Sequence, residues 1–108
     1  TDAVAACGMP DGGYHLGRHP IQKTGETVRL ADGTLAGSVL TMGRAFTNFA
    51  ALGLDQAEIV RRTSTIAADY LGLADRGRLV VGLRADLALI DARGGIAGVV
   101  SQGRPIGG

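Results

Sequence analysis

The sequence predicts a mixed α+β fold, and three observations indicate it. The patterns along the chain are β-rich, then α-rich, then β-rich. Residues Thr27–Leu30 alternate with a period of two, which is typical of a half-buried strand. Apolar residues between Leu40 and Leu52 recur at spacings near three and four, as in an amphipathic helix. Aromatic residues make up only 4% and Trp is absent, so the core must be built from aliphatic side chains.

The first third of the chain is expected to contain short strands joined by turns. Residues 1–12 have the pattern of a strand end followed by a loop. Short strands are expected at Tyr14–Gly17 and within Gln22–Leu30, with a turn at Lys23–Glu26. The segment Leu35–Ser38 is small and Gly-rich, which favours a loop that opens the following helix.

The middle of the chain is expected to be helical. A helix is predicted over Val39–Leu52, with Ser38 accepting a backbone N–H at its start and Gly53 ending it. A second helix begins at Asp55, and Glu58 stands three residues later, as in a capping box.

A third short helix is expected at about Ile66–Leu71, capped by Ser64 or Thr65 and ended by Gly72. Strand patterns then return, and the expected strands are Arg78–Val80, Asp86–Asp91 and Ile96–Ser101. The change of pattern near Gly72–Gly77 is the best candidate for a domain boundary.

Composition and charge exclude several classes of function. With 11 basic and 10 acidic residues the net charge is +1, and no stretch has the clustered Lys and Arg of a nucleic-acid-binding surface. No run of 18 apolar residues exists, so no membrane span is expected. The single cysteine, Cys7, excludes an internal disulfide, fits a reducing cytoplasm and is expected to pack beside a loop. The first residue is not Met, which suggests a fragment or a processed chain.

Two features could carry chemistry. Asp2 can act as a general base or acid, or as a metal ligand, if it stands at the end of a barrel strand. By itself it also fits a solvated terminal residue. The segment Leu35–Ser38 could present backbone N–H groups to a ligand, because small residues allow close approach. The alternative is a plain turn and a helix cap.

The remaining polar residues indicate structural roles. His15 and His19 are four residues apart, but Gly17 and Pro20 stand around them, so they do not form a helical metal-binding pair. Asp32 and Asp86 are expected at turns and strand edges, and Asp86 could accept a neighbouring backbone N–H.

Taken together, these segments resemble the N-acetylglucosamine-6-phosphate deacetylases of the amidohydrolase superfamily. The stretches that carry the resemblance are Thr1–Ala3, Leu30–Met42, Arg61–Leu73 and Gly77–Asp91. The last of these is common to many amidohydrolases, whereas the sequence Asp-Gly-Thr-Leu-Ala-Gly-Ser at residues 32–38 narrows the match to this deacetylase. The resemblance covers nearly the whole chain but corresponds to less than the last third of the family's chain.

The resemblance implies a particular architecture. Residues 1–76 would be the C-terminal segment of a (β/α)₈ hydrolase barrel, comprising the end of its last strand and the helices that follow. Residues 77–108 would be strands of a small appended β-sandwich. A barrel cannot close from this segment alone, so we expect the isolated chain to hide its apolar barrel-facing surface by self-association.

The resemblance also implies a reaction and a set of site residues. The family hydrolyses the acetamide of N-acetylglucosamine 6-phosphate, with a metal's assistance, to glucosamine 6-phosphate and acetate. Asp2 matches the general base that follows barrel strand eight. Leu35, Ala36 and Gly37 match the family's substrate-contacting loop.

The family's metal ligands and its phosphate-binding residues lie upstream of the position of Asp2. The parent enzyme would therefore hold a divalent metal, Zn or a similar ion, through residues that are not in this chain. The isolated chain is expected to be inactive for that reason. The parent is expected to be a cytoplasmic homo-oligomer, a dimer, that binds a sugar phosphate and neither nucleic acid nor membrane. The alternative is a non-catalytic α/β binding or assembly module of amidohydrolase-like architecture.

Overall fold

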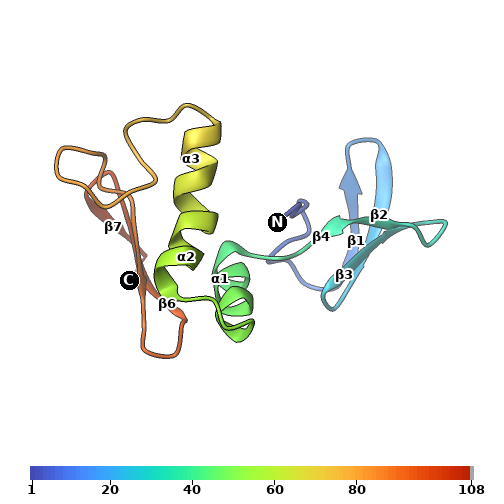
Figure 1. The fold of residues 1–108 in the computed structure, drawn as a ribbon. Helices are drawn as coiled ribbons and strands as arrows, with labels where there is room; N and C mark the ends of the chain where they lie inside the picture. Colours follow the sequence, from blue (N-terminus) through green and yellow to red (C-terminus); the bar gives the residue numbers. More distant parts are fainter. Residues whose placement is uncertain (108) are drawn as a thin grey trace. The chain divides into compact units, whose positions relative to one another are not determined.

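The computed structural model describes residues 1–107, and the chain forms two compact units (Figure 1). Unit 1 spans Thr1–Ala45, and unit 2 begins at Phe46. Each unit contains one antiparallel sheet, and helical segments lie between the two sheets in the sequence. The expected α+β class is confirmed. No helix within residues 1–107 is long and apolar enough to span a membrane.

Unit 1 is built on a four-stranded sheet of neighbouring antiparallel strands. In chain order and in spatial order these strands are β1 (Gly12–Leu16), β2 (His19–Thr24), β3 (Thr27–Leu30) and β4 (Leu35–Ser38). The turns between the first three strands contain Gly17 and Gly25, whose φ angles are 59° and 58°. Such left-handed conformations favour glycine, and they allow the tight hairpins that set the register of the sheet.

The core of unit 1 consists of small and aliphatic side chains, as the composition predicts. Ile21 is 3% exposed and Val28 is fully buried, whereas their neighbours Gln22 and Arg29 are exposed. This alternation is the two-residue period of strands with one face packed. Ala6 and Ala36 complete the buried cluster.

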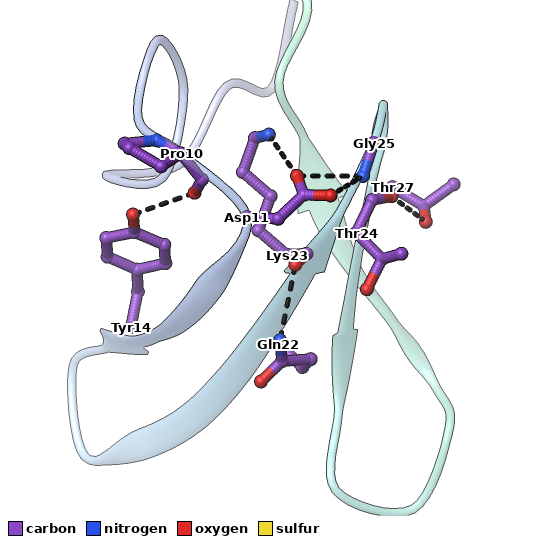
Figure 2. Close-up of polar contacts among 8 residues, drawn as sticks. All are labelled: Pro10, Asp11, Tyr14, Gln22, Lys23, Thr24, Gly25 and Thr27. Carbon is purple, nitrogen blue, oxygen red and sulfur yellow. Dashed lines mark hydrogen bonds and ion pairs between the residues drawn. The ribbon is translucent and has the colours of Figure 1, made fainter.

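A polar cluster ties the start of β1 to the turn between β2 and β3 (Figure 2). The Asp11 carboxylate accepts hydrogen bonds from the Lys23 ammonium at 2.9 Å and from the Gly25 N–H at 2.9 and 3.0 Å. The hydrogen bond from Lys23 and that from Gly25 lower the pKa of Asp11 below its ordinary value. The Tyr14 hydroxyl donates to the Pro10 carbonyl at 2.8 Å. These contacts fix the first hairpin at the edge of the sheet.

The segment Leu35–Ser38 is a strand, so the expectation of a loop that opens a helix was wrong. Its backbone pairs with β3, with Arg29 opposite Leu35 and Thr27 opposite Ser38. A Gly-rich segment carries little strand propensity of its own, and the pairing with β3 decides its conformation.

The first helix, α1 (Met42–Ala51), begins later than expected. Its start is capped by the Thr41 hydroxyl, which accepts from the Arg44 N–H at 3.2 Å, and not by Ser38. Its end follows the prediction. Gly53 has φ 83°, and its N–H donates to the Ala50 carbonyl at 2.9 Å, as in a Schellman motif.

One uninterrupted helical stretch follows, made of α2 (Gln56–Val60), the π-helical segment η1 (Arg61–Thr65) and α3 (Ile66–Tyr70). The predicted cap is confirmed, because the Asp55 carboxylate accepts from the Glu58 N–H at 2.9 Å. The prediction of a separate third helix was wrong, since neither the Ser64 nor the Thr65 side chain caps a helix start. The Thr65 hydroxyl instead donates to the Gly77 carbonyl at 2.6 Å.

Glu58 should make the stability of unit 2 depend on pH. Hydrogen bonds from Arg61 and Arg62, at 2.6–2.9 Å, lower the pKa of Glu58 to about 2. A carboxylate with a lower pKa in the folded state stabilises the fold above its unfolded pKa and loses that effect as the pH falls through the folded value. Glu58→Gln should therefore unfold at lower urea concentration than the unmodified chain at pH 6, and the two should converge toward pH 2. A difference that does not change with pH would contradict this assignment.

Unit 2 ends in a three-stranded sheet, in the order β5 (Leu87–Ile90), β6 (Ile96–Ser101) and β7 (Arg104–Ile106). The expected strand at Arg78–Val80 was wrong, because among residues 1–107 this segment pairs with neither sheet. Its apolar pattern is that of a strand, but a strand also needs a paired backbone, and this segment lacks one among the described residues. The expected role of Asp86 is confirmed, since its carboxylate accepts from the Gln102 N–H at 2.8 Å.

Gly77→Ala should destabilise unit 2 by about 1–3 kcal/mol. Gly77 has φ 86°, and a Cβ there would lie 2.5 Å from the Ala68 Cβ and 3.3 Å from the Ser64 carbonyl oxygen. Gly82→Ala is the matched control, because Gly82 has a similar φ of 90° with nothing within 4 Å of the added carbon. Urea unfolding of both variants separates the close contact from the backbone effect. Equal losses in the two variants would show that the close contact at Gly77 is unimportant.

Candidate functional site

Asp2 is anchored to the last residue of β4. The Ser38 N–H donates to the Asp2 carbonyl at 2.9 Å, and the Val4 N–H donates to the Ser38 carbonyl at 2.9 Å. Together they form a parallel bridge between Ala3 and Ser38. The Ser38 hydroxyl donates to the Thr1 carbonyl and accepts from the Leu40 N–H at 3.1 Å. The strand end expected within residues 1–12 is thus a single bridge against β4.

Gly37 lies directly against Asp2. A Cβ at Gly37 would be 3.2 Å from the Asp2 carbonyl oxygen and 3.5 Å from its carboxylate Oδ2, and only 2.6 Å from the Val4 Cγ1. The φ of Gly37 is 114°, a conformation that side chains with a Cβ rarely adopt. Two of the predicted site residues, Asp2 and Gly37, are therefore neighbours although 35 positions separate them in the sequence.

The backbone of Asp2 has a conformation that is uncommon for a residue with a Cβ. Its φ is 53°, in the left-handed region. Aspartate tolerates this region better than most residues, but the conformation still costs free energy and persists only where surrounding contacts impose it. The bonds to Ser38 are such contacts. Asp2 is an exposed residue.

Leu35 and Ala36 differ in their exposure to solvent. Leu35 is 62% exposed, whereas Ala36 is 8% exposed and packs in the core of unit 1. A contact between Ala36 and a ligand would therefore be made by its main chain. The register between β3 and β4 shifts between Thr27 and Arg29, so β4 contains one residue more than its partner there. Such irregularities redirect the strand and commonly occur beside functional sites.

The other sequence candidates make different contacts. His15 and His19 are exposed on β1 and β2. The Cys7 thiol is half-buried and donates to the Val39 carbonyl at 3.2 Å. Asp32 accepts from the Thr34 N–H at 2.9 Å in the turn between β3 and β4, as expected, and this bond lowers its pKa. Residues 1–107 contain no group of three or more His, Cys, Asp or Glu side chains that could hold a metal ion. Within this described part of the chain, the side chains by themselves therefore provide no three-ligand metal site.

Ser38 is the residue whose role the sequence interpretation missed. The pattern suggested a helix cap, but both its backbone and its hydroxyl contact the segment that contains Asp2. The only signal in the sequence is its position directly after Gly37, and this does not reveal a contact with residues more than thirty positions away.

The fold is of the α+β class, and comparisons with known proteins show which enzymes the chain is similar to. No protein-family model matches the chain. The chain is 39% identical over 92 residues to the N-acetylglucosamine-6-phosphate deacetylase of Lysinibacillus sphaericus, and the match covers 84% of the chain and 24% of that enzyme. It is 40% identical over 94 residues to the N-acetylgalactosamine-6-phosphate deacetylase of Escherichia coli O157:H7, covering 85% of the chain and 25% of that enzyme. The chain thus spans about a quarter of the length of these relatives.

Solved structures agree with the sequence comparison. The N-acetylglucosamine-6-phosphate deacetylase of Thermotoga maritima superposes with a TM-score of 0.89 at 37% identity, over 97% of this chain and 29% of that one. A mutant of the Mycobacterium smegmatis enzyme, in complex with N-acetyl-D-glucosamine-6-phosphate, superposes with a TM-score of 0.82 at 34% identity, over 95% of this chain and 28% of that one. The resemblance to N-acetylglucosamine-6-phosphate deacetylases is confirmed, and the coverage is consistent with a C-terminal fragment of such an enzyme.

Proposed function

We propose that this chain is the C-terminal segment of an amino-sugar-phosphate deacetylase and supplies the general base, Asp2, and part of the substrate-binding surface, Leu35–Gly37. The observation that carries the proposal is the contact between Asp2 and Gly37. Two segments that the resemblance assigns to one active site lie side by side in unit 1. The similarity of the chain to deacetylases over most of its length supports the same assignment.

The chemistry proposed for Asp2 is proton transfer during amide hydrolysis. Its carboxylate accepts a proton from the attacking water while the water oxygen bonds to the acetamide carbon. The same carboxyl group then gives that proton to the leaving nitrogen as the C–N bond breaks, which yields acetate and the amino sugar phosphate. Such transfer is the ordinary role of a general acid–base, and the exposure of Asp2 leaves it accessible for this role.

The rest of the machinery is proposed to lie outside this chain. A divalent metal, Zn or a similar ion, would polarise the amide and activate the water in the complete enzyme, held by residues upstream of Asp2. We also propose that residues 1–76 close the barrel and that residues 77–108 join the small sandwich. The sugar phosphate is the proposed substrate class, with a dimeric, cytoplasmic parent enzyme.

Exposed apolar side chains support the proposal that a larger protein covers this chain. Leu79, Val80 and Val81 are consecutive in the chain and are 86%, 56% and 102% exposed. Large apolar side chains exposed together mark surfaces that contact other protein. The isolated chain should therefore self-associate, and light scattering should give a mass above its 11.0 kDa. A monodisperse monomer would count against this expectation.

The proposal is tested with a chimera. This chain replaces the segment that it matches in the Lysinibacillus sphaericus deacetylase, and the product is called here the deacetylase chimera. Acetate release from N-acetylglucosamine 6-phosphate, in the presence of Zn²⁺, should be restored in the chimera and absent in the 108-residue chain. A folded chimera without activity would favour the binding or assembly module instead. Turnover by the chain alone would show that no upstream residues are needed.

A further inference from the structure

We infer that Ser38 is a positioning residue that holds Asp2 in its reactive conformation, an inference that rests on the proposed function of Asp2. Ser38 contacts the segment Thr1–Val4 through three groups. Its N–H donates to the Asp2 carbonyl, its hydroxyl donates to the Thr1 carbonyl, and its carbonyl accepts from the Val4 N–H. One residue of β4 thus holds both sides of Asp2.

The backbone angle of Asp2 explains why such an anchor is needed. A φ of 53° is unfavourable for a residue with a Cβ, so an unrestrained Asp2 would leave this conformation. The carbonyl oxygens of Thr1 and Asp2 flank the Asp2 backbone, and Ser38 binds both of them. Removing the hydroxyl releases the Thr1 carbonyl, and also the Leu40 N–H, while the backbone bridge remains. The Asp2 carboxylate is then expected to sample several orientations instead of one.

Gly37 leaves space for the segment that contains Asp2 to pack against β4. Its missing Cβ allows Val4 and Asp2 to approach β4 closely enough for the bonds to Ser38 to form. The pair Gly37–Ser38 therefore combines close approach with anchoring. The opposite strand offers a matched control, because Thr27 stands across from Ser38 and its hydroxyl also donates to a backbone carbonyl, that of Thr24 at 3.0 Å.

The first arm of the experiment measures steady-state kinetics in the deacetylase chimera. Ser38→Ala should lower kcat by about 10- to 100-fold, because a misplaced catalytic group loses most of its effect. KM should change by less than about twofold, since the substrate still binds. Ser38→Thr, which keeps the hydroxyl, should restore kcat, and Thr27→Ala should leave it unchanged. A Ser38→Ala variant with unchanged kcat, or an equal loss in Thr27→Ala, would overturn the inference.

The second arm does not depend on activity. In the 108-residue chain, backbone couplings and chemical shifts measured by NMR should report a positive φ for Asp2. In Ser38→Ala these values should move toward those of a mobile residue, and in Thr27→Ala they should not. An Asp2 signal that is the same in Ser38→Ala as in the unmodified chain contradicts the inference. Because this arm reads conformation alone, an inactive chimera would reject the proposed function without deciding the role of Ser38.

Discussion

Replacing Asp2 with Asn in the deacetylase chimera is expected to lower kcat by about 10²- to 10⁴-fold, the usual contribution of a general acid–base. Asparagine keeps the size of the side chain and also tolerates a left-handed backbone, so the bonds to Ser38 can remain. It cannot accept and return a proton. The loss should therefore appear in kcat, with KM little changed.

A second carboxylate in the same unit provides the control. Asp32 accepts a backbone N–H in the turn between β3 and β4, and an Asn side chain can make the same bond through its carbonyl. Asp32→Asn should leave kcat within about twofold of the unmodified chimera, as is usual for a surface substitution that keeps its bonds. Steady-state acetate release from both variants, with circular dichroism to confirm folding, checks the prediction. An active Asp2→Asn chimera would remove Asp2 from the mechanism.

Ile21→Ala is expected to destabilise unit 1 by about 2–5 kcal/mol, because it leaves a cavity in a small core. Ile21 is 3% exposed and is buried with Val28 and two alanines, and four partly buried side chains pack against this cluster: Val4, Tyr14, Leu30 and Val39. A unit of this size has little stability to lose. The sheet also carries β4, so its loss should release Ser38 and Asp2 as well.

The control for this substitution is the next residue of the same strand. Gln22 points to the exposed side, so Gln22→Ala should cost less than about 0.5 kcal/mol. Amide hydrogen exchange in the 108-residue chain checks both variants. Protection of the Val4 and Ser38 amides should fall in Ile21→Ala and persist in Gln22→Ala. Unchanged protection in Ile21→Ala would show that the cluster does not hold the sheet together.

Local signals in the sequence predicted the helical region best. Gly53 ends α1 and Asp55 caps α2 as expected, because these features depend only on residues within one or two turns. The separate helix after Thr65 was wrong, since the helix continues through the π-helical segment and the Thr65 hydroxyl binds Gly77 instead. That contact joins positions twelve residues apart, which a capping pattern does not include.

The strands were predicted less well, because whether a segment forms a strand depends on its pairing with another strand. Leu35–Ser38 lacks a clear strand pattern but pairs with β3, whereas Arg78–Val80 has the pattern but pairs with no strand within residues 1–107. The same physical reason applies to the site. The resemblance assigned Asp2 and Gly37 to one active site, but the anchoring of Asp2 by Ser38 depends on contacts across more than thirty residues. No local pattern predicts such contacts.

The most direct test of the central claim is acetate release by the purified deacetylase chimera, measured beside the 108-residue chain and the parent Lysinibacillus sphaericus enzyme. The claim that this chain supplies a working general base to a deacetylase predicts a chimera kcat within about tenfold of the parent enzyme, a difference of about 1.4 kcal/mol in activation free energy. It also predicts no release by the chain alone. A chimera that folds and binds Zn²⁺ yet releases no acetate would contradict the claim.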